Sequence, residues 1–213
     1  MYPAAASSPI VYVLDDDAAI RQALERLVRS VGLDVRTFPS ASEFLASARA
    51  DRPSCLVVDV RMPGLSGLDL QDSLSASGWS SPIIFITGHG TVPLSVRAMR
   101  NGAVDFLQKP FEDQAILDSI RAAIDREVDA WGVRLRQSEI QKQIGTLTPR
   151  EHEVFVLVVS GLPNKRIAGQ LGTSEKTIKV HRARVMEKMC AGSLAALVRM
   201  AQETERVSPA ARA

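Results

Sequence analysis

Five short runs rich in β-branched and aromatic residues recur through the first 125 residues, and helical patterns separate them. The runs lie at 10–14, 33–38, 55–58, 82–87 and 103–107. Between the first two, apolar residues recur three or four positions apart over 18–31, and Gly32 follows as a stop signal. Strands that alternate with helices favour a parallel sheet with helices on both faces. Right-handed crossovers leave few topologies, and strand order 2-1-3-4-5 is the common one at this size.

The composition is that of a globular chain. Of 213 residues, 46% are apolar and 23% are charged, close to ordinary usage. No apolar run approaches the roughly 20 residues of a membrane span, and the first ten residues lack the basic start and apolar stretch of a signal peptide. Cys55 and Cys190 lie far apart, which excludes a disulfide framework. These features predict a soluble, cytoplasmic protein with no membrane partner.

Polar residues mark the carboxyl ends of four predicted strands, where open parallel sheets place their ligand sites. They are Asp15, Asp16 and Asp17 after the first strand, Asp59 at the end of the third, Thr87 at the end of the fourth and Lys109 after the fifth. The first, third and fourth strands are neighbours in the predicted order, and the fifth borders the fourth. One site should therefore hold several carboxylates, one hydroxyl and one ammonium group.

This set of side chains suits phosphoryl chemistry. Carboxylate oxygens are the ligands of Mg²⁺ or Mn²⁺, and a carboxylate beside a divalent cation and a lysine can attack phosphorus. Asp59 is the best nucleophile candidate, because it is central and a roomy loop, VRMPGLSG, follows it. Lys109 would offset charge on the transferring group, and Thr87 could donate a hydrogen bond to it. Each residue has a plain structural explanation by itself, but together those explanations require four coincidences at one edge.

The last third of the chain is basic. Residues 1–125 hold 11 basic and 15 acidic side chains, whereas residues 146–213 hold 11 and 6. Seven cations fall between positions 164 and 188. A short helix at 165–171, a turn, and a longer helix at 175–189 capped by Ser174 predict a helix-turn-helix, whose second helix enters the major groove of DNA. A last helix is predicted at 194–201. A solvated basic face is the alternative interpretation.

A helical pattern links the two parts over 126–145. Ile124, Val128, Trp131 and Leu135 are spaced 4-3-4, which approximates a short heptad seam. The segment is either a lever or dimerising coil, or a solvated helix with one core-facing stripe, and the sequence favours neither. The predicted organisation is 8–125, a linker over 126–145, a helical domain over 146–202 and a disordered tail over 203–213.

The first part resembles the receiver domain of two-component response regulators through VLDDD, VVDVRMPG, IIFITGHG and GAVDFLQKPF. The resemblance implies that Asp59 accepts a phosphoryl group from a sensor histidine kinase. It also implies a metal site, a lysine that pairs with the phosphoryl group before a cis bond, and two switch residues. The ligands of Mg²⁺ would be Asp15, Asp16, Asp59 and the backbone carbonyl of Arg61. The lysine would be Lys109, which precedes Pro110, and the switch residues would be Thr87 and Phe106.

The last part resembles the DNA-binding domain of the LuxR/NarL type through LTPREHEV and GLPNKRIAGQLGTSEKTIKVHRARVMEKM, and looks nearest to the FixJ subgroup. The resemblance implies promoter DNA as a partner. Lys179, Val180 and Arg182 are the candidates for groove contacts. Lys165, Lys176, Thr177, His181 and Arg184 complete the predicted DNA surface, most of them as phosphate contacts.

Together these patterns predict a transcriptional regulator switched by phosphorylation, with self-phosphotransfer and autodephosphorylation as its only chemistry. Phosphorylation should favour a homodimer through the receiver, or release of the DNA-binding domain, and RNA polymerase is a further candidate partner. A phosphatase of the haloacid dehalogenase type is one rival, although DDDAA breaks its D-x-D-x-[TV] motif. A receiver that dimerises without responding to phosphate is the other.

Overall fold

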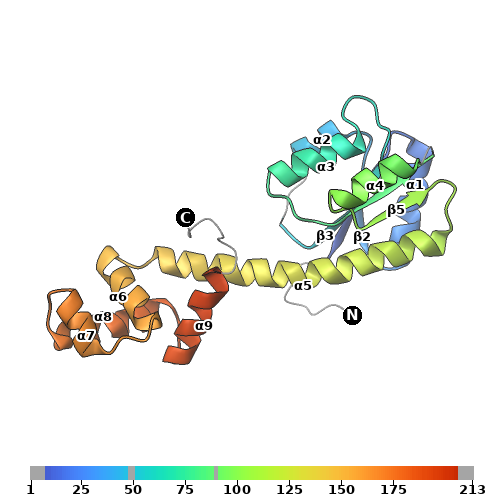
Figure 1. Cartoon of the computed structure of the whole chain (residues 1–213). Coiled ribbons are helices and arrows are strands. Elements are labelled where there is room, and N and C mark those ends of the chain that lie inside the picture. The colour runs from blue at the N-terminus through green and yellow to red at the C-terminus, as the bar shows by residue number, and fades with distance from the viewer. Residues whose placement is uncertain (1–7, 48–50, 89–90, 206–213) are drawn as a thin grey trace. The chain divides into compact units, whose positions relative to one another are not determined.

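The structure is a computed structural model that describes residues 8–47, 51–88 and 91–205 (Figure 1). The chain divides into two units between Trp131 and Gly132, inside one long helix. The last two residues of the IIFITGHG motif, 89–90, lie outside the described residues. No helix in the described ranges is long and apolar enough to cross a membrane.

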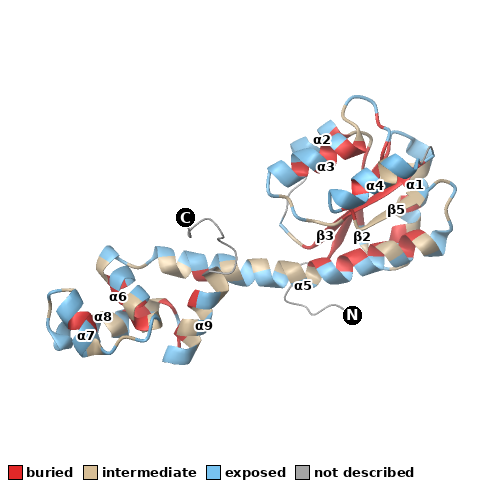
Figure 2. Ribbon diagram, viewed as in Figure 1, coloured by how far each residue is buried: buried red, intermediate tan, exposed pale blue. Residues whose placement is uncertain are grey.

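The first unit contains one parallel five-stranded sheet with the order β2-β1-β3-β4-β5, which confirms the prediction. The strands are β1 (Ile10–Leu14), β2 (Asp34–Phe38), β3 (Ser54–Asp59), β4 (Ile83–Thr87) and β5 (Asp105–Gln108). β1, β3 and β4 are buried along their whole length (Figure 2), as strands covered on both faces must be. β5 begins later than predicted, because the N–H of Ala103 bonds to the Ala98 carbonyl and closes the preceding helix.

Helices cover both faces of the sheet. They are α1 (Ala18–Ser30), α2 (Ala41–Ser47), α3 (Gly67–Ala76), α4 (Val92–Arg100) and α5 (Asp113–Gly145). Successive residues of a strand point to opposite faces, so Tyr12 and Leu14 join the core under α2, α3 and α4, whereas Val11 and Val13 join the core under α1 and the start of α5. The near-continuous apolar strands of the sequence follow from this double cover.

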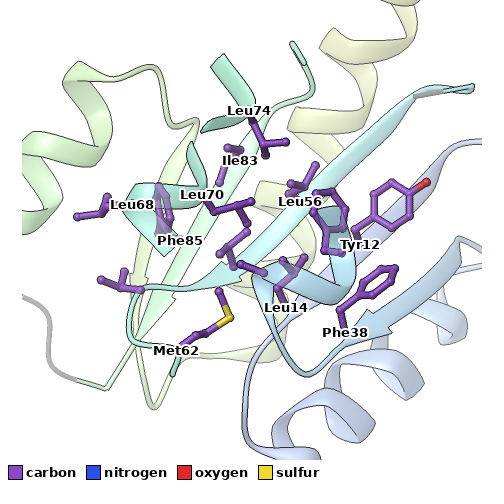
Figure 3. Close-up of a cluster of buried hydrophobic side chains, with 14 of the residues drawn as sticks. Tyr12, Leu14, Phe38, Leu56, Met62, Leu68, Leu70, Leu74, Ile83 and Phe85 are labelled. Atoms are coloured by element: carbon purple, nitrogen blue, oxygen red, sulfur yellow. The ribbon is translucent and has the colours of Figure 1, made fainter. Parts of the chain in front are cut away.

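The core under α2, α3 and α4 extends from Tyr12 and Phe38 on one side to Leu68 and Phe85 on the other (Figure 3). Tyr12 and Phe38 pack as tilted rings with centroids 6.0 Å apart. Met62 belongs to the same core and is only 7% exposed, although it lies in the loop that follows β3. The core therefore anchors the chain directly after Asp59.

α5 is one continuous helix of 33 residues that takes part in the cores of both units. Ile124 is buried and Val128 packs against the core of the first unit, whereas Ile140 is buried in the core of the second. Leu135 is 48% exposed. Two residues of the 4-3-4 seam are thus occupied within the first unit, and a coil between two copies of this helix stays a prediction.

The second unit is all helical, as predicted, and contains α6 (Pro149–Val159), α7 (Asn164–Gln170), α8 (Glu175–Lys188) and α9 (Leu194–Glu205). Thr148 and Glu151 form the capping box that starts α6. The four helices pack around a core that includes Val158, Ile178 and Leu197. α7 and α8 form the helix-turn-helix.

The end of α9 differs from the prediction of a disordered tail from residue 203. The helix continues to Glu205. The carboxylate of Glu203 accepts a hydrogen bond from Arg136 at 2.6 Å, and its carbonyl accepts one from Gln137 at 3.2 Å. These bonds to α5 hold the last turn, and residues 206–213 lie outside the described residues.

Candidate functional site

The carboxyl ends of β1, β3 and β5 bring three ionisable side chains together. Asp15 follows β1 directly, Asp59 is the last residue of β3, and Lys109 follows β5. β1 and β3 pair in parallel, so Asp15 and Asp59 emerge from neighbouring strands at the same edge. The N–H of Lys109 donates to the Thr87 carbonyl at 2.8 Å, which ties the end of β5 to the end of β4.

The ammonium group of Lys109 bridges the two carboxylates. Its Nζ donates to Oδ2 of Asp15 at 2.6 Å and to Oδ1 of Asp59 at 2.8 Å. The side chain of Asp15 is 1% exposed and that of Asp59 is 7% exposed, whereas the side chain of Lys109 is 20% exposed. Two buried carboxylates at one edge require a countercharge, and this lysine supplies it. The peptide bond between Lys109 and Pro110 is cis, as the resemblance implies.

Burial and pairing act in opposite directions on these groups. Burial raises the pKa of Asp15, and the hydrogen bond from Lys109 only partly offsets it. Burial disfavours the charge on Lys109, but its hydrogen bonds to Asp15 and Asp59 outweigh that effect and raise the pKa of the ammonium. The lysine is therefore held as a cation, while Asp15 carries the cost of desolvation.

The remaining neighbours of Asp59 come from β4, β5 and the loop after β3. The backbone N–H of Arg61 donates to Oδ2 of Asp59 at 2.6 Å. Thr87 ends β4, the strand beside β3, and is 1% exposed. Phe106 on β5 is half-buried, and its ring lies 6.4 Å from that of Phe85. Sequence reasoning missed the Arg61 amide, because a backbone donor leaves no signature in side-chain identity.

Gly67, the first residue of α3, lies against the carbonyl of Asp59. A Cβ at this position would stand 2.4 Å from that carbonyl oxygen, closer than real Cβ contacts. The N–H of Gly67 also donates to the Val60 carbonyl at 3.1 Å. The last glycine of VRMPGLSG thus lets α3 start directly beside the end of β3.

The aspartates of the β1–α1 turn have separate roles. Asp17 caps α1, because its Oδ1 accepts from the N–H of Ala19 at 2.7 Å. Asp16 is exposed, and its carbonyl accepts a hydrogen bond from Arg21 at 2.9 Å. Sequence reasoning missed Arg21. The signal that could have revealed it is its position, because a cation in the first turn of a helix opposes the helix dipole and needs another partner.

The oxygen atoms at this edge are chemically suited to a divalent cation. Within the described ranges, no three histidine, cysteine or carboxylate side chains are already grouped to hold a metal ion. Lys109 stands between Asp15 and Asp59, and Asp16 is exposed nearby in sequence. Hard carboxylate oxygens with open positions match what Mg²⁺ requires, since it keeps several waters.

The helix-turn-helix presents the second group of predicted residues. Those that are exposed on α7 and α8 are Lys165, Lys176, Thr177, Lys179, Val180 and Arg184. His181 and Arg182 are half-buried, and Arg182 donates to Oδ1 of Asn164 at 3.1 Å. Val180 is 47% exposed and does not belong to the core of the second unit.

One of the seven clustered cations has a structural role. Lys188, at the end of α8, donates to Oε2 of Glu151 at 2.6 Å and to the Thr146 carbonyl at 3.0 Å. Lys188 and the capping box lower the pKa of Glu151 to about 2. The contact ties the start of α6 to the end of α8. Sequence reasoning missed it, because the two residues are 37 positions apart.

A parallel sheet with this acidic edge, followed by a basic helix-turn-helix, defines a receiver domain joined to a DNA-binding domain. Comparison with known families agrees: the response regulator receiver domain matches residues 11–121, and the luxR family of bacterial regulatory proteins matches residues 145–201.

Among curated proteins, Nodulation protein W of Bradyrhizobium diazoefficiens is 50% identical over 93% of this chain and 87% of its own. Transcriptional regulatory protein FixJ of Azorhizobium caulinodans is 49% identical over 90% of each. The solved structure of the response regulator StyR has a TM-score of 0.83 at 45% identity, over 92% of this chain and all of that one.

The chain belongs to the FixJ/NarL-type response regulators of two-component systems, with a LuxR-type DNA-binding domain. Members of this family are transcriptional regulators rather than conventional enzymes, which sets the phosphatase alternative aside. The receiver domain implies a histidine kinase as partner, and the helix-turn-helix implies DNA.

Proposed function

We propose that Asp59 is the phospho-acceptor of this regulator and that its phosphorylation controls promoter binding. The observation that carries the proposal is the buried pair of Asp15 and Asp59 with the Lys109 ammonium between them. An ammonium held at 2.8 Å from the acceptor carboxylate can stabilise charge that develops on a transferring phosphoryl group. The kinase and the chromosome share one compartment, so the proposal places the regulator in the cytoplasm.

The transfer requires little from the protein beyond positioning. A carboxylate oxygen of Asp59 attacks the phosphorus of a phosphohistidine, and the new O–P bond forms as the N–P bond breaks. The electron pair of the broken bond stays on the imidazole nitrogen of the kinase. Lys109 then pairs with the phosphoryl oxygens, and the hydroxyl of Thr87 donates to them. The Arg61 amide holds the other carboxylate oxygen of Asp59 at 2.6 Å.

Receiver domains generally use Mg²⁺, and the oxygen donors at this edge fit that ion. Asp15, Asp16, Asp59 and the Arg61 carbonyl would hold it. When bound, the ion supplies charge neutralisation for the phosphoryl oxygens. Mn²⁺ has the same ligand preference and should substitute.

Phosphorylation adds about −1.5 to −2 charge beside Lys109, and we propose that this shift favours a homodimer. α4 follows Thr87 in the chain and exposes Val92, Val96 and Met99 at 76%, 42% and 48%. An apolar helix face beside the switch residues is a natural dimer surface. A change from 1:99 to 99:1 requires about 5.5 kcal/mol of differential stabilisation.

In the dimer, each α8 would enter a major groove, with half-sites about one helical turn apart. We assign Lys179 and Val180 to base edges, because they are exposed in the first two turns of α8. Arg182 is held by Asn164 at 3.1 Å, so it presents its free donors from a fixed position. The phosphate contacts are Lys165, Lys176, Thr177, His181 and Arg184. RNA polymerase would be a further partner of the regulator at the promoter.

The test is the solution mass of the full chain, by light scattering, with and without Mg²⁺ and beryllofluoride as a phosphoryl mimic. We expect a monomer that becomes a dimer only with the mimic, and no change in Asp59→Asn. Asp118→Asn, at a side chain 63% exposed on α5, is the matched control and should dimerise normally. If neither the solution mass nor the DNA affinity changes when the mimic is added, the receiver does not respond to phosphate.

A further inference from the structure

Arg21 reaches back from the first turn of α1 to the turn that carries the acidic residues. Its Nη1 donates to the carbonyl of Asp15 at 2.6 Å and to the carbonyl of Asp16 at 2.9 Å. The side chain is half-buried. A cation at this end of a helix is unfavourable by itself, so the two carbonyl bonds are what explain its position.

These bonds determine the backbone on both sides of Asp16. The Asp15 carbonyl belongs to the peptide plane before Asp16, and the Asp16 carbonyl belongs to the plane after it. Because peptide units are planar, fixing both planes fixes the two backbone dihedrals of Asp16 and therefore the direction of its Cα–Cβ bond.

The neighbouring aspartates have other restraints. The N–H of Asp15 donates to the Phe38 carbonyl at 3.2 Å, and Oδ1 of Asp15 accepts from the N–H of Asp17 at 2.9 Å. Asp17 is fixed as the cap of α1. Asp16 itself is exposed, and Arg21 bonds to the carbonyls of both planes that flank it. The N–H of Asp17 lies in the second of these planes, so its bond to Oδ1 of Asp15 supports that plane as well.

We propose that Arg21 is a positioning residue for the divalent-cation site, where it fixes the β1–α1 turn so that the Asp16 carboxylate adds to the oxygens of Asp15 and Asp59. The proposal rests on the function proposed above, because it requires that these residues hold Mg²⁺.

Charge and geometry predict opposite results when Arg21 is removed. A nearby cation repels Mg²⁺. If Arg21 acts only through its charge, its removal should therefore strengthen Mg²⁺ binding. Loss of the two carbonyl bonds loosens the backbone on both sides of Asp16, so removal of an Arg21 that acts by positioning would weaken Mg²⁺ binding. The sign of the change therefore separates the two roles.

The experiment measures the Mg²⁺ dissociation constant of the full chain by calorimetric titration for wild type, Arg21→Met and Arg21→Lys. Arg26→Met is the matched control, because Arg26 is exposed on the same helix. We expect binding about tenfold weaker in Arg21→Met, since loss of a residue that orients metal ligands costs 10–100-fold. Arg21→Lys retains a donor and should recover part of this loss, and Arg26→Met should match wild type.

A second readout is the rise in thermal midpoint caused by saturating Mg²⁺, which follows the ratio of free ion to dissociation constant. Tighter or unchanged binding in Arg21→Met would overturn the proposal. So would a midpoint that falls equally with and without Mg²⁺ while the dissociation constant stays the same, because that describes a purely structural role. If Arg21→Met does not fold, Arg21→Gln, which keeps an amide donor without the charge, gives the same comparison. A wild-type chain that fails to bind Mg²⁺ would refute the metal site itself, and this inference with it.

Discussion

Gly67→Ala should both destabilise the receiver and slow its phosphorylation. The added Cβ would stand 2.4 Å from the Asp59 carbonyl oxygen, 3.0 Å from Cγ1 of Val58 and 3.1 Å from Cε1 of Phe85. Ordinary contacts begin at 3.4 Å, so the carbonyl and the start of α3 must separate by about 1 Å. All three neighbours are buried, and overpacking of a dense core costs about 1–3 kcal/mol.

The same shift moves the acceptor, because the displaced carbonyl belongs to Asp59. A misplacement of about 1 Å can cost about 10²-fold in rate. The assays are urea unfolding followed by circular dichroism, and the initial rate of phosphorylation by acetyl phosphate. Gly132→Ala is the control: nothing lies within 4 Å of its Cβ position, and it lies inside α5. If Gly67→Ala kept wild-type stability and rate, the close approach of α3 would not constrain the site as argued.

Three further outcomes are expected. Gly169→Ala, inside α7 with nothing within 4 Å of the new Cβ, should stabilise the DNA-binding domain by up to about 1 kcal/mol in thermal unfolding; a lower midpoint would contradict this. Lys188 holds the pKa of Glu151 at about 2, below its usual 4.5, so the carboxylate stabilises the fold above pH 4.5 and this contribution disappears as the pH falls toward 2. Glu151→Gln should flatten the acid unfolding curve in that window, measured by circular dichroism. Lys165→Ala should reduce the slope of log affinity against log salt by about 1 for any duplex DNA, and an unchanged slope would exclude this residue as a phosphate contact.

Boundaries of helices and strands that depend on neighbouring residues could be predicted well from the sequence. β1 ends where predicted, and α8 starts directly after its predicted cap, Ser174, because both depend on residues adjacent in sequence. β5 and α9 were predicted less well at one end. The start of β5 depends on a helix-closing bond at Ala103, and the end of α9 depends on Glu203 reaching Arg136, 67 positions away.

The candidate phosphorylation site likewise has features that the sequence predicts and features that only the folded structure gives. Asp59 and Lys109 could be placed together from strand order alone, since parallel strands end at one edge of the sheet. The bridge that Lys109 makes to both carboxylates, and the role of Gly67, depend on distances that only the packed structure gives. Arg21 acts through two backbone carbonyls, which leave no mark in residue type, and Lys188 pairs with Glu151, which lies 37 positions away in the chain.

The shared helix α5 has a practical consequence for dissecting the protein. The luxR-family match starts at residue 145, and a fragment cut there would contain all of α6, α7, α8 and α9. It would lack Ile140, which is 3% exposed in that domain's core and whose burial contributes about 1.5–3 kcal/mol. It would also lose the bond from Arg136 to Glu203 that holds the end of α9. A stable fragment must begin near residue 132, so about the last four turns of α5 belong to the DNA-binding domain although they precede the family match in sequence.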